Sequence, residues 1–324
     1  MIILTGGAGF IGSCFLSKLN YEGEKEIIVV DHLGYTSKWN NLTGKSFLDY
    51  FEKDEFLDKL DKFRPHKKMK AIFHIGACSS TMETDASYLI ENNYEYSKKL
   101  AMWAFDNNVP FYYASSAATY GDGRFGYSDE DENTLRLLPL NMYGYSKHLF
   151  DLWLLKNKLL DKVVGFKYFN VFGPNEYHKG EMRSLVVKAY HQIKKDRKIK
   201  LFKSYRPEYK DGEQQRDFIY IKDVVNLMYH FYAESNVRGI FNVGTGRART
   251  WNDLANAVFS ALEIPTQIEY IDMPEIMREK YQYFTQADLS KMREKDISIS
   301  FASLENSVAD YVKNYLEKNS AFLA

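Results

Sequence analysis

The sequence predicts an α/β protein with a doubly wound parallel sheet and a smaller, mixed α/β C-terminal domain. Three observations predict this class. Short apolar runs alternate with segments whose apolar residues recur at helical spacing, a glycine-rich turn joins the first run to the first helical segment, and the polarity changes after Gly173-Pro174. Alternating strands and helices indicate βαβ units, which build parallel sheets covered by helices on both faces.

The first 173 residues supply most of this alternation. The opening run Met1 to Thr5 is apolar and β-branched and breaks at Gly6, as a buried strand would. The pattern then predicts helices at 10–19, 85–108 and 143–158, and strands at 26–31, 71–74, 111–115 and 163–169.

Residues 174–216 are polar and contain few strand signals, whereas 217–221 and 239–243 return to strand character. An amphipathic helix is predicted at 251–262. We therefore expect a dinucleotide-binding Rossmann domain from residues 1–173 plus 217–247, and a substrate-binding domain from residues 174–216 plus 248–324.

Composition narrows the class of protein. The 324 residues carry no formal net charge, so there is no electrostatic reason to expect binding to nucleic acid. Two cysteines imply no disulfide framework. The chain lacks an apolar run of about 18 residues and its first strand begins at Ile2, so we expect no membrane partner, no signal peptide and a cytoplasmic location.

The glycines Gly6, Gly9 and Gly12 form a dinucleotide-binding pattern between the first strand and the first helix. Gly6 would allow the tight turn, Gly9 would let the backbone approach a pyrophosphate, and Gly12 would let the helix pack closely on the strand. The helix N-terminus supplies free N–H groups and a favourable dipole for phosphates.

Asp31, at the end of the second predicted strand, bears on which dinucleotide is bound. Its carboxylate would accept a hydrogen bond from the ribose 2′-OH of NAD. His32, Lys38 and Lys53 follow, and one or two of these cations could instead reach the 2′-phosphate of NADP. Taken alone, these residues leave NADP and NAD both open.

Tyr143 and Lys147 are four residues apart, so they share one face of a helix. A free tyrosine has a pKa of about 10, and a nearby ammonium would lower that pKa and favour the phenolate. A phenolate suits proton abstraction from a sugar hydroxyl while hydride leaves for a nicotinamide. Ser116, at the end of a predicted strand, could hydrogen-bond the reacting oxygen. The spacing also arises by chance on exposed helices, and it becomes specific through the glycine pattern upstream.

Together these features resemble the extended short-chain dehydrogenase/reductase superfamily. Within it, finer segments resemble the family of ADP-L-glycero-D-manno-heptose 6-epimerases. The resembling segments are 74–81, 91–94, 169–174, 178–180, 216–218 and 281–289. This resemblance implies an isomerase that inverts C6 of ADP-D-glycero-β-D-manno-heptose through a 6-keto intermediate with bound NADP, for lipopolysaccharide core biosynthesis.

The resemblance also implies roles for individual residues. Tyr143 and Lys179 would act as acid and base on opposite faces of the reacting carbon, assisted by Lys147 and Ser116. The implied cofactor-binding set, with the glycine pattern, is Gly6, Gly9, Phe10, Ile11, Gly12, Asp31, His32, Lys38, Lys53, Ile75, Gly76, Ala77, Cys78, Ser79, Asn92, Tyr143, Lys147, Val171 and Lys179. The implied substrate-binding set is Ser79, Ser116, Asn170, Glu181, Lys188, Phe202, Lys203, Ser204, Tyr205, Arg216 and Tyr281.

Some positions depart from the family pattern. Ile75 and His32 differ from its usual residues, and Glu181 and Lys188 stand where a small polar residue and a histidine are typical. Residues 203–215 are also longer than usual. These departures bear on contacts with the base and the diphosphate more than on the chemistry.

The sequence also bears on functions other than the epimerase. A 4,6-dehydratase would need an Asp-Glu pair after the strand-end serine, and residues 117–120 supply neither carboxylate. A C4-epimerase or a reductase of the same superfamily remains open because fold does not fix substrate. A non-catalytic dinucleotide-binding protein would not need the tyrosine, lysine and serine. We expect no metal site. The resemblance and the 16% aromatic content together predict a homo-oligomer.

Overall fold

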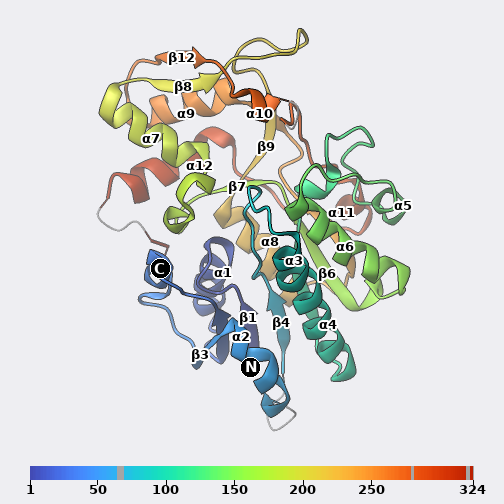
Figure 1. Cartoon of the computed structure of the whole chain (residues 1–324). Helices are drawn as coiled ribbons and strands as arrows, with labels where there is room; N and C mark the ends of the chain where they lie inside the picture. The colour runs from blue at the N-terminus through green and yellow to red at the C-terminus, as the bar shows by residue number, and fades with distance from the viewer. Residues whose placement is uncertain (64–68, 279–280, 319–321, 324) are drawn as a thin grey trace.

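The computed structural model describes residues 1–63, 69–278, 281–318 and 322–323 (Figure 1). Its main feature is a seven-stranded sheet in which every neighbouring pair of strands is parallel. In spatial order the strands are β10 (Gly239–Val243), β6 (Val163–Tyr168), β5 (Phe111–Ser116), β4 (Ala71–His74), β1 (Ile2–Thr5), β2 (Ile27–Asp31) and β3 (Asp49–Glu52). The predicted α/β class with a doubly wound parallel sheet is confirmed.

Helices cover both faces of this sheet. Successive side chains of a strand point to opposite faces, and in these strands both sets are apolar. Ile2 and Leu4 face one core with α1 (Phe10–Tyr21) and α8 (Ile221–Ala233), which pack against each other. Ile3 faces the other core, which is covered by α4 (Tyr96–Asp106) and α6 (Met142–Lys156). Burial on both faces explains why the strands read as continuous apolar runs.

The helix predicted over 85–108 is not uniform. It consists of α3 (Ala86–Leu89), a π-helical turn at Ile90–Glu95 and α4. The π turn carries Asn92 and Asn93, which are buried, and Asn93 accepts from the backbone N–H of Cys78 in the turn after β4. π turns occur often at functional sites because they redirect side chains inside a helix.

A second lobe lies above the carboxyl ends of the main strands (Figure 1). Its helices are α7 (Leu185–Asp196), α9 (Trp251–Leu262) and α12 (Leu304–Tyr311). The chain here also forms a two-stranded sheet, β12 (Ile268–Ile271) with β8 (Ile199–Phe202), and a three-stranded sheet, β11 (Ala248–Thr250), β9 (Gln215–Tyr220) and β7 (Asn170–Phe172). The short helices are α2 (Lys53–Lys59), α5 (Asp131–Thr134), α10 (Glu275–Arg278) and α11 (Ser290–Glu294).

Residues 174–216 are more regular than their polarity indicated, because α7 buries only one face, which includes Val186, Val187 and Ile193. The predicted strand at 217–221 is β9, which pairs with β7 and β11, whereas β10 joins the main sheet. The predicted domain boundaries remain a prediction. Among the described residues, no helix has the length and apolar character needed to cross a bilayer.

Candidate active site

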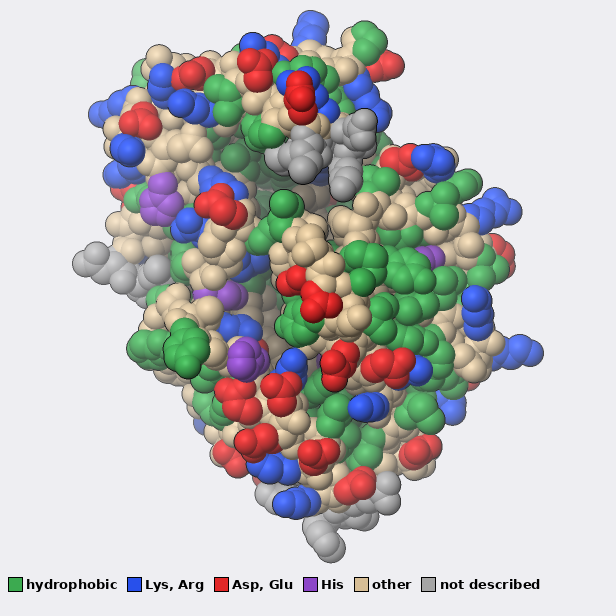
Figure 2. Space-filling view, in the orientation of Figure 1, with side chains coloured by type: hydrophobic (Ala, Val, Ile, Leu, Met, Phe, Trp, Pro, Cys, Tyr) green, Lys and Arg blue, Asp and Glu red, His purple; other side chains and the backbone are tan. Residues whose placement is uncertain are grey.

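A cavity of about 610 Å³ opens at the carboxyl ends of the main strands, where parallel sheets usually bind their ligands. Figure 2 shows the hollow between the lower part of the molecule and the second lobe. All the residues that the sequence analysis placed in the cofactor set line this cavity. They come from the turns after β1, β2 and β4, from the starts of α1 and α2, from the π turn, from α6, and from β7 and the turn that follows it.

Backbone contacts explain why glycine occupies the first turn. Gly6 has a φ of +70°, and a Cβ there would lie 2.5 Å from the backbone nitrogen of Gly76. A Cβ on Gly12 would lie 2.1 Å from the carbonyl oxygen of Gly6. Gly9 is the N-cap of α1 and carries no side chain to cover the first N–H groups. The end of α1 can therefore receive a pyrophosphate through backbone N–H groups and the helix dipole.

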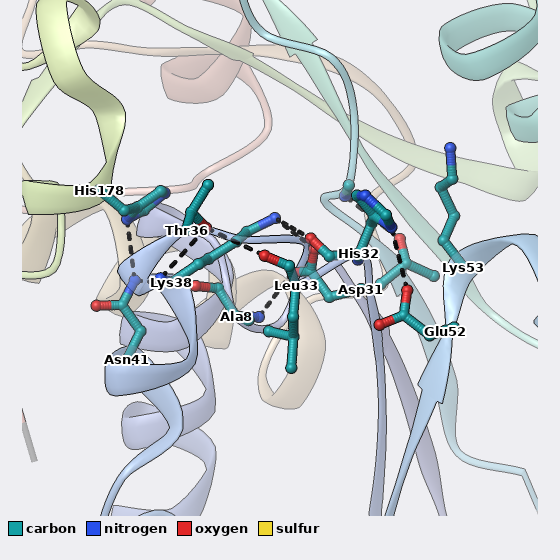
Figure 3. A network of polar contacts seen from close by, with 12 residues as sticks. Ala8, Asp31, His32, Leu33, Thr36, Lys38, Asn41, Glu52, Lys53 and His178 are labelled. Carbon is teal, nitrogen blue, oxygen red and sulfur yellow. Dashed lines mark hydrogen bonds and ion pairs between the residues drawn. The ribbon is translucent and has the colours of Figure 1, made fainter.

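The carboxylate of Asp31 is held by three groups at the rim (Figure 3). Its Oδ2 accepts from the backbone N–H of Ala8 at 2.8 Å, and its Oδ1 accepts from the backbone N–H of His32 at 2.7 Å. The ammonium of Lys38 forms an ion pair with Oδ1. Asp31 is 6% exposed, so this pair neutralises a carboxylate that faces the cavity from a buried position.

Two further basic side chains line the same rim. Lys53 donates to Oδ1 of Asn92 at 2.6 Å, which ties the start of α2 to the π turn. The His32 ring contacts Glu52 at 3.2 Å. The basic groups expected near a 2′-phosphate therefore stand around one end of the cavity, where Figure 3 shows Lys53 extending away from Asp31.

Tyr143, Lys147 and Ser116 meet where α6 begins against the end of β5. The side chain of Asn141 caps α6 by accepting from the N–H of Gly144 at 2.8 Å. A Cβ on Gly144 would lie 2.7 Å from the carbonyl oxygen of Ala118, so glycine lets α6 approach the turn after β5. This approach brings the tyrosine and the strand-end serine into one wall of the cavity.

The pKa of Tyr143 differs in direction from the sequence argument. Burial raises this pKa above its usual value, and a side-chain hydrogen bond with Ser116 opposes the rise. Lys147 donates to the carbonyl oxygen of Ala114 at 2.9 Å, and burial lowers its pKa to about 8. The lowering of the tyrosine pKa that the spacing predicted is therefore wrong for this structure, because desolvation is the largest influence on Tyr143. A raised pKa favours the protonated phenol.

Lys179 reaches the cavity from a 3₁₀ turn at Tyr177–Met182. Its ammonium lies 5.2 Å from the centre of the Phe10 ring, close to the start of α1. Burial lowers the pKa of Lys179, and the buried carboxylate of Glu176 opposes this. A lysine with a lowered pKa exchanges a proton more readily near neutral pH, which suits an acid/base role.

His178 fixes the same turn to the dinucleotide end of the cavity. Its Nδ1 lies 3.2 Å from the amide nitrogen of Asn41, which also donates to the carbonyl oxygens of Ala8 and Asn175 (Figure 3). Burial, together with Lys38 and Lys179, lowers the pKa of His178 to about 4, so its ring is neutral at physiological pH. The turn that carries Lys179 is thus anchored to the loops after β1 and β2.

The predicted substrate residues divide into two groups. Ser79, Ser116 and Asn170 line the cavity. The others lie outside its described lining, in the turn after β7 and in the second lobe: Glu181, Lys188, Phe202, Lys203, Ser204, Tyr205, Arg216 and Tyr281.

Contacts in the second lobe account for this second group. The Arg216 guanidinium is buried and stacks on the ring of Tyr281 at 5.2 Å. The Tyr205 hydroxyl donates to Asp272 at 2.9 Å, and Lys203 pairs with the same carboxylate at 3.2 Å. Glu181 and Lys188 pair with each other at 3.3 Å.

Sequence reasoning missed several residues of the cavity wall that come from the second lobe. Trp251 and Leu254, on the first turns of α9, line it together with Thr285. Arg183 adds another cation. Trp251 and Leu254 fit an ordinary amphipathic helix, and only the packing of α9 above the main sheet turns these side chains towards the cavity. Among the described residues, no group of three or more His, Cys, Asp and Glu side chains could hold a metal ion.

Comparisons with known proteins agree with this geometry. The sequence model of the NAD dependent epimerase/dehydratase family matches residues 2–244. The chain is 50% identical over 323 residues to ADP-L-glycero-D-manno-heptose-6-epimerase of Nitratidesulfovibrio vulgaris (strain DP4), covering 100% of both chains. It is 46% identical to the protein of the same name from Fusobacterium nucleatum, again covering 100% of both.

Solved structures give the same picture. The crystal structure of Helicobacter pylori ADP-L-glycero-D-manno-heptose-6-epimerase matches with a TM-score of 0.80 at 28% identity, covering 97% of this chain and 95% of that one. A UDP-N-acetylglucosamine 4-epimerase from Methanobrevibacter ruminantium M1 also reaches 0.80, at 27% identity, covering 96% of each. The chain is thus an isomerase with a nicotinamide cofactor, and it belongs to the NAD dependent epimerase/dehydratase family and, within it, to the ADP-L-glycero-D-manno-heptose-6-epimerases.

Proposed function

We propose that this enzyme inverts C6 of ADP-D-glycero-β-D-manno-heptose to give ADP-L-glycero-β-D-manno-heptose. One observation carries the proposal: Ser116, Tyr143 and Lys179 line the same cavity as the glycine turn, in a chain 50% identical over its length to an enzyme of that name. The product would serve lipopolysaccharide core biosynthesis, in the cytoplasm.

The residues of the cavity fit a nicotinamide dinucleotide. The glycine turn leaves room for a pyrophosphate, and Lys147 offers an ammonium beside the end of β5. The bound cofactor would accept a hydride from C6 and return it. NADP is the better candidate, because Lys38 already neutralises Asp31, and Lys53 adds a second cation at the same rim, which His32 also lines.

The side chains then handle protons. Inversion requires that hydride leave one face of C6 and return to the other, so the 6-keto intermediate must turn in the cavity. One residue accepts the proton of the C6 hydroxyl as hydride leaves, and after the turn the other donates a proton to the ketone oxygen as hydride returns. Tyr143 and Lys179 would fill these two roles from separate elements, α6 and the turn at 177–182. Ser116 would hold the reacting oxygen near Tyr143, and Lys147, mostly charged at neutral pH with a pKa of about 8, would orient the nicotinamide ribose.

The first test is to incubate the purified chain with ADP-D-glycero-β-D-manno-heptose in D2O, without added cofactor, and follow it by proton NMR. We expect the C6 epimer without deuterium at C6, because internal hydride return admits no solvent proton at that carbon. No change, from protein shown to carry oxidised dinucleotide, would contradict the substrate assignment. The UDP-sugar substrates of C4-epimerases would then be tested.

Single replacements test the two acid/base residues. Tyr143→Phe and Lys179→Met should each abolish inversion and leave the dinucleotide bound. Tyr145→Phe and Lys194→Met are matched controls, because both side chains are more than 40% exposed and lie outside the described lining of the cavity. A Tyr143 or Lys179 variant that inverted C6 at the wild-type rate would show that its residue has another role.

A further inference from the structure

A buried carboxylate, Asp151, lies one turn of α6 beyond Lys147. Both of its oxygens are used. Oδ1 accepts from the hydroxyl of Tyr113 at 2.8 Å, and Oδ2 accepts from the hydroxyl of Ser115 and from the ammonium of Lys167, each at 2.7 Å. Asp151 therefore joins α6 to β5 and β6 directly beneath the wall of the cavity that carries Tyr143.

The side chains of Asp151 and Lys167 are both 0% exposed. A buried ion pair is weak evidence for stability, because the cost of removing two charges from water can equal or exceed their attraction. Replacing the pair by apolar residues of similar size would be neutral or stabilising in many proteins. A charged pair at this position therefore calls for another explanation, and its neighbours suggest one.

Those neighbours connect the pair to Ser116 and Lys147, to which the proposed function assigns the substrate and the dinucleotide. Lys167 also donates to Thr119, whose hydroxyl donates to the carbonyl oxygen of Ser116 at 2.8 Å. Lys147 donates to the carbonyl oxygen of Ala114, the residue before Ser115. The network thus holds the end of β5 between two lysines, one of which lines the cavity while the other does not.

The charges around Lys147 also connect it to Asp151. Burial lowers the pKa of Lys147, and Asp151 is the strongest group opposing that change. The other titratable groups around these two residues are His74 of β4, Cys78 of the turn after β4, Tyr113 of β5, Lys167 of β6, and Tyr143 and His148 of α6. His74 and His148 have pKa values lowered to about 3 and about 4, so both rings are neutral at pH 7.

We propose that Asp151 is a positioning residue for the epimerisation, which keeps the ammonium of Lys147 charged and fixes the end of β5 against α6. Lys167 balances its charge and orients it. This inference rests on the proposed function for the role of Lys147, but the state of Lys147 can also be measured without turnover.

The test compares three variants in the full chain: Asp151→Asn, Lys167→Met, and Asp129→Asn as the matched control. Asp129 is a buried carboxylate, 2% exposed, that accepts from the backbone N–H of Asn242 and lies outside the described lining of the cavity. Two quantities are measured between pH 6 and 9.5: kcat, and the affinity for NADP alone by titration calorimetry.

Both kcat and the affinity for NADP should decrease at alkaline pH as Lys147 loses its proton. In Asp151→Asn the midpoint of this decrease, the alkaline fall, should move to lower pH by on the order of one pH unit, because Lys147 loses its proton more easily without the carboxylate. KM for the nucleotide sugar should change less than kcat. Lys167→Met removes a cation and leaves the carboxylate, so it should move the same fall to higher pH. Asp129→Asn should leave it in place.

Opposite displacement in the two network variants is the result that a purely structural role would not give. An alkaline fall that stays in place in Asp151→Asn, or that fails to rise in Lys167→Met, would overturn the proposal. If Asp151→Asn does not fold, Lys167→Met alone decides. If the wild type binds NADP but does not invert C6, the proposed function fails while the binding midpoints still decide the role of Asp151.

Discussion

Replacing Lys38 with methionine tests how the rim of the cavity selects its dinucleotide. Lys38 forms an ion pair with the buried carboxylate of Asp31, and both residues line the cavity. Methionine keeps much of the aliphatic bulk and removes the cation. Asp31 would keep its bonds from the N–H groups of Ala8 and His32 but would present an unbalanced negative charge.

The two dinucleotides should respond differently. A hydrogen bond to a charged group contributes about 1.5–3 kcal/mol, so NADP should bind roughly 10- to 150-fold more weakly. Repulsion between Asp31 and the 2′-phosphate would add to this loss. NAD should bind as well as before or slightly better, because Asp31 becomes free to accept from a ribose 2′-OH.

Titration calorimetry with NADP and with NAD, at two salt concentrations, measures these changes. Lys59→Met is the matched control, because Lys59 lies on the neighbouring helix α2, pairs with Glu55 and lies outside the described lining of the cavity. Thermal unfolding of each variant separates weaker binding from a damaged fold. Equal weakening of NADP and NAD, or no change in either, would show that Lys38 does not select the cofactor.

Three further predictions concern stability and assembly. Gly12→Ala should lower the free energy of unfolding by about 1–3 kcal/mol and reduce dinucleotide retention, because the new Cβ would lie 2.1 Å from the carbonyl oxygen of Gly6. A variant whose Tm in thermal unfolding equals that of the wild type would contradict this. His74 is neutral when folded, with a pKa lowered to about 3, so the unfolded chain binds its proton first as pH falls below about 6.5. Stability should therefore decline towards pH 3, by at most about 1.4 kcal/mol per pH unit from this residue, and chemical denaturation should show a shallower decline in His74→Gln. Light scattering should give the mass of an oligomer, and a monomeric mass would remove that prediction.

Local patterns were sufficient for the dinucleotide end of the site. The glycine turn and Asp31 line one cavity, because backbone sterics at Gly6 and Gly12 leave few alternatives and parallel strands bring their carboxyl ends to one edge. The other residues of the cofactor set, which line the same cavity, came largely from the family resemblance. The helix at 251–262 was predicted with its observed ends. The capping box at Thr250 explains why its start can be recognised in the sequence, because that motif involves only residues within one helical turn.

Regions with weaker local signals were predicted less well. β3 is a polar edge strand, and β8 pairs with β12 from a distant part of the chain, so neither has an apolar run that reveals it. The resemblance supplied Lys179 and Arg216, but it did not separate the residues in the cavity wall from those in the second lobe.

The sequence by itself determined the fold class, the dinucleotide turn and the placing of Tyr143 and Lys147 on one helix, because each depends on neighbours within a few residues or on strand order. Only the tertiary structure decided the direction in which the pKa values of the site residues move and which buried residues hold them in place. Burial raises the pKa of Tyr143 where the spacing alone predicted a decrease. Asp151 meets β5 and β6 only after the sheet has formed, since desolvation and long-range hydrogen bonds exist only in the packed molecule.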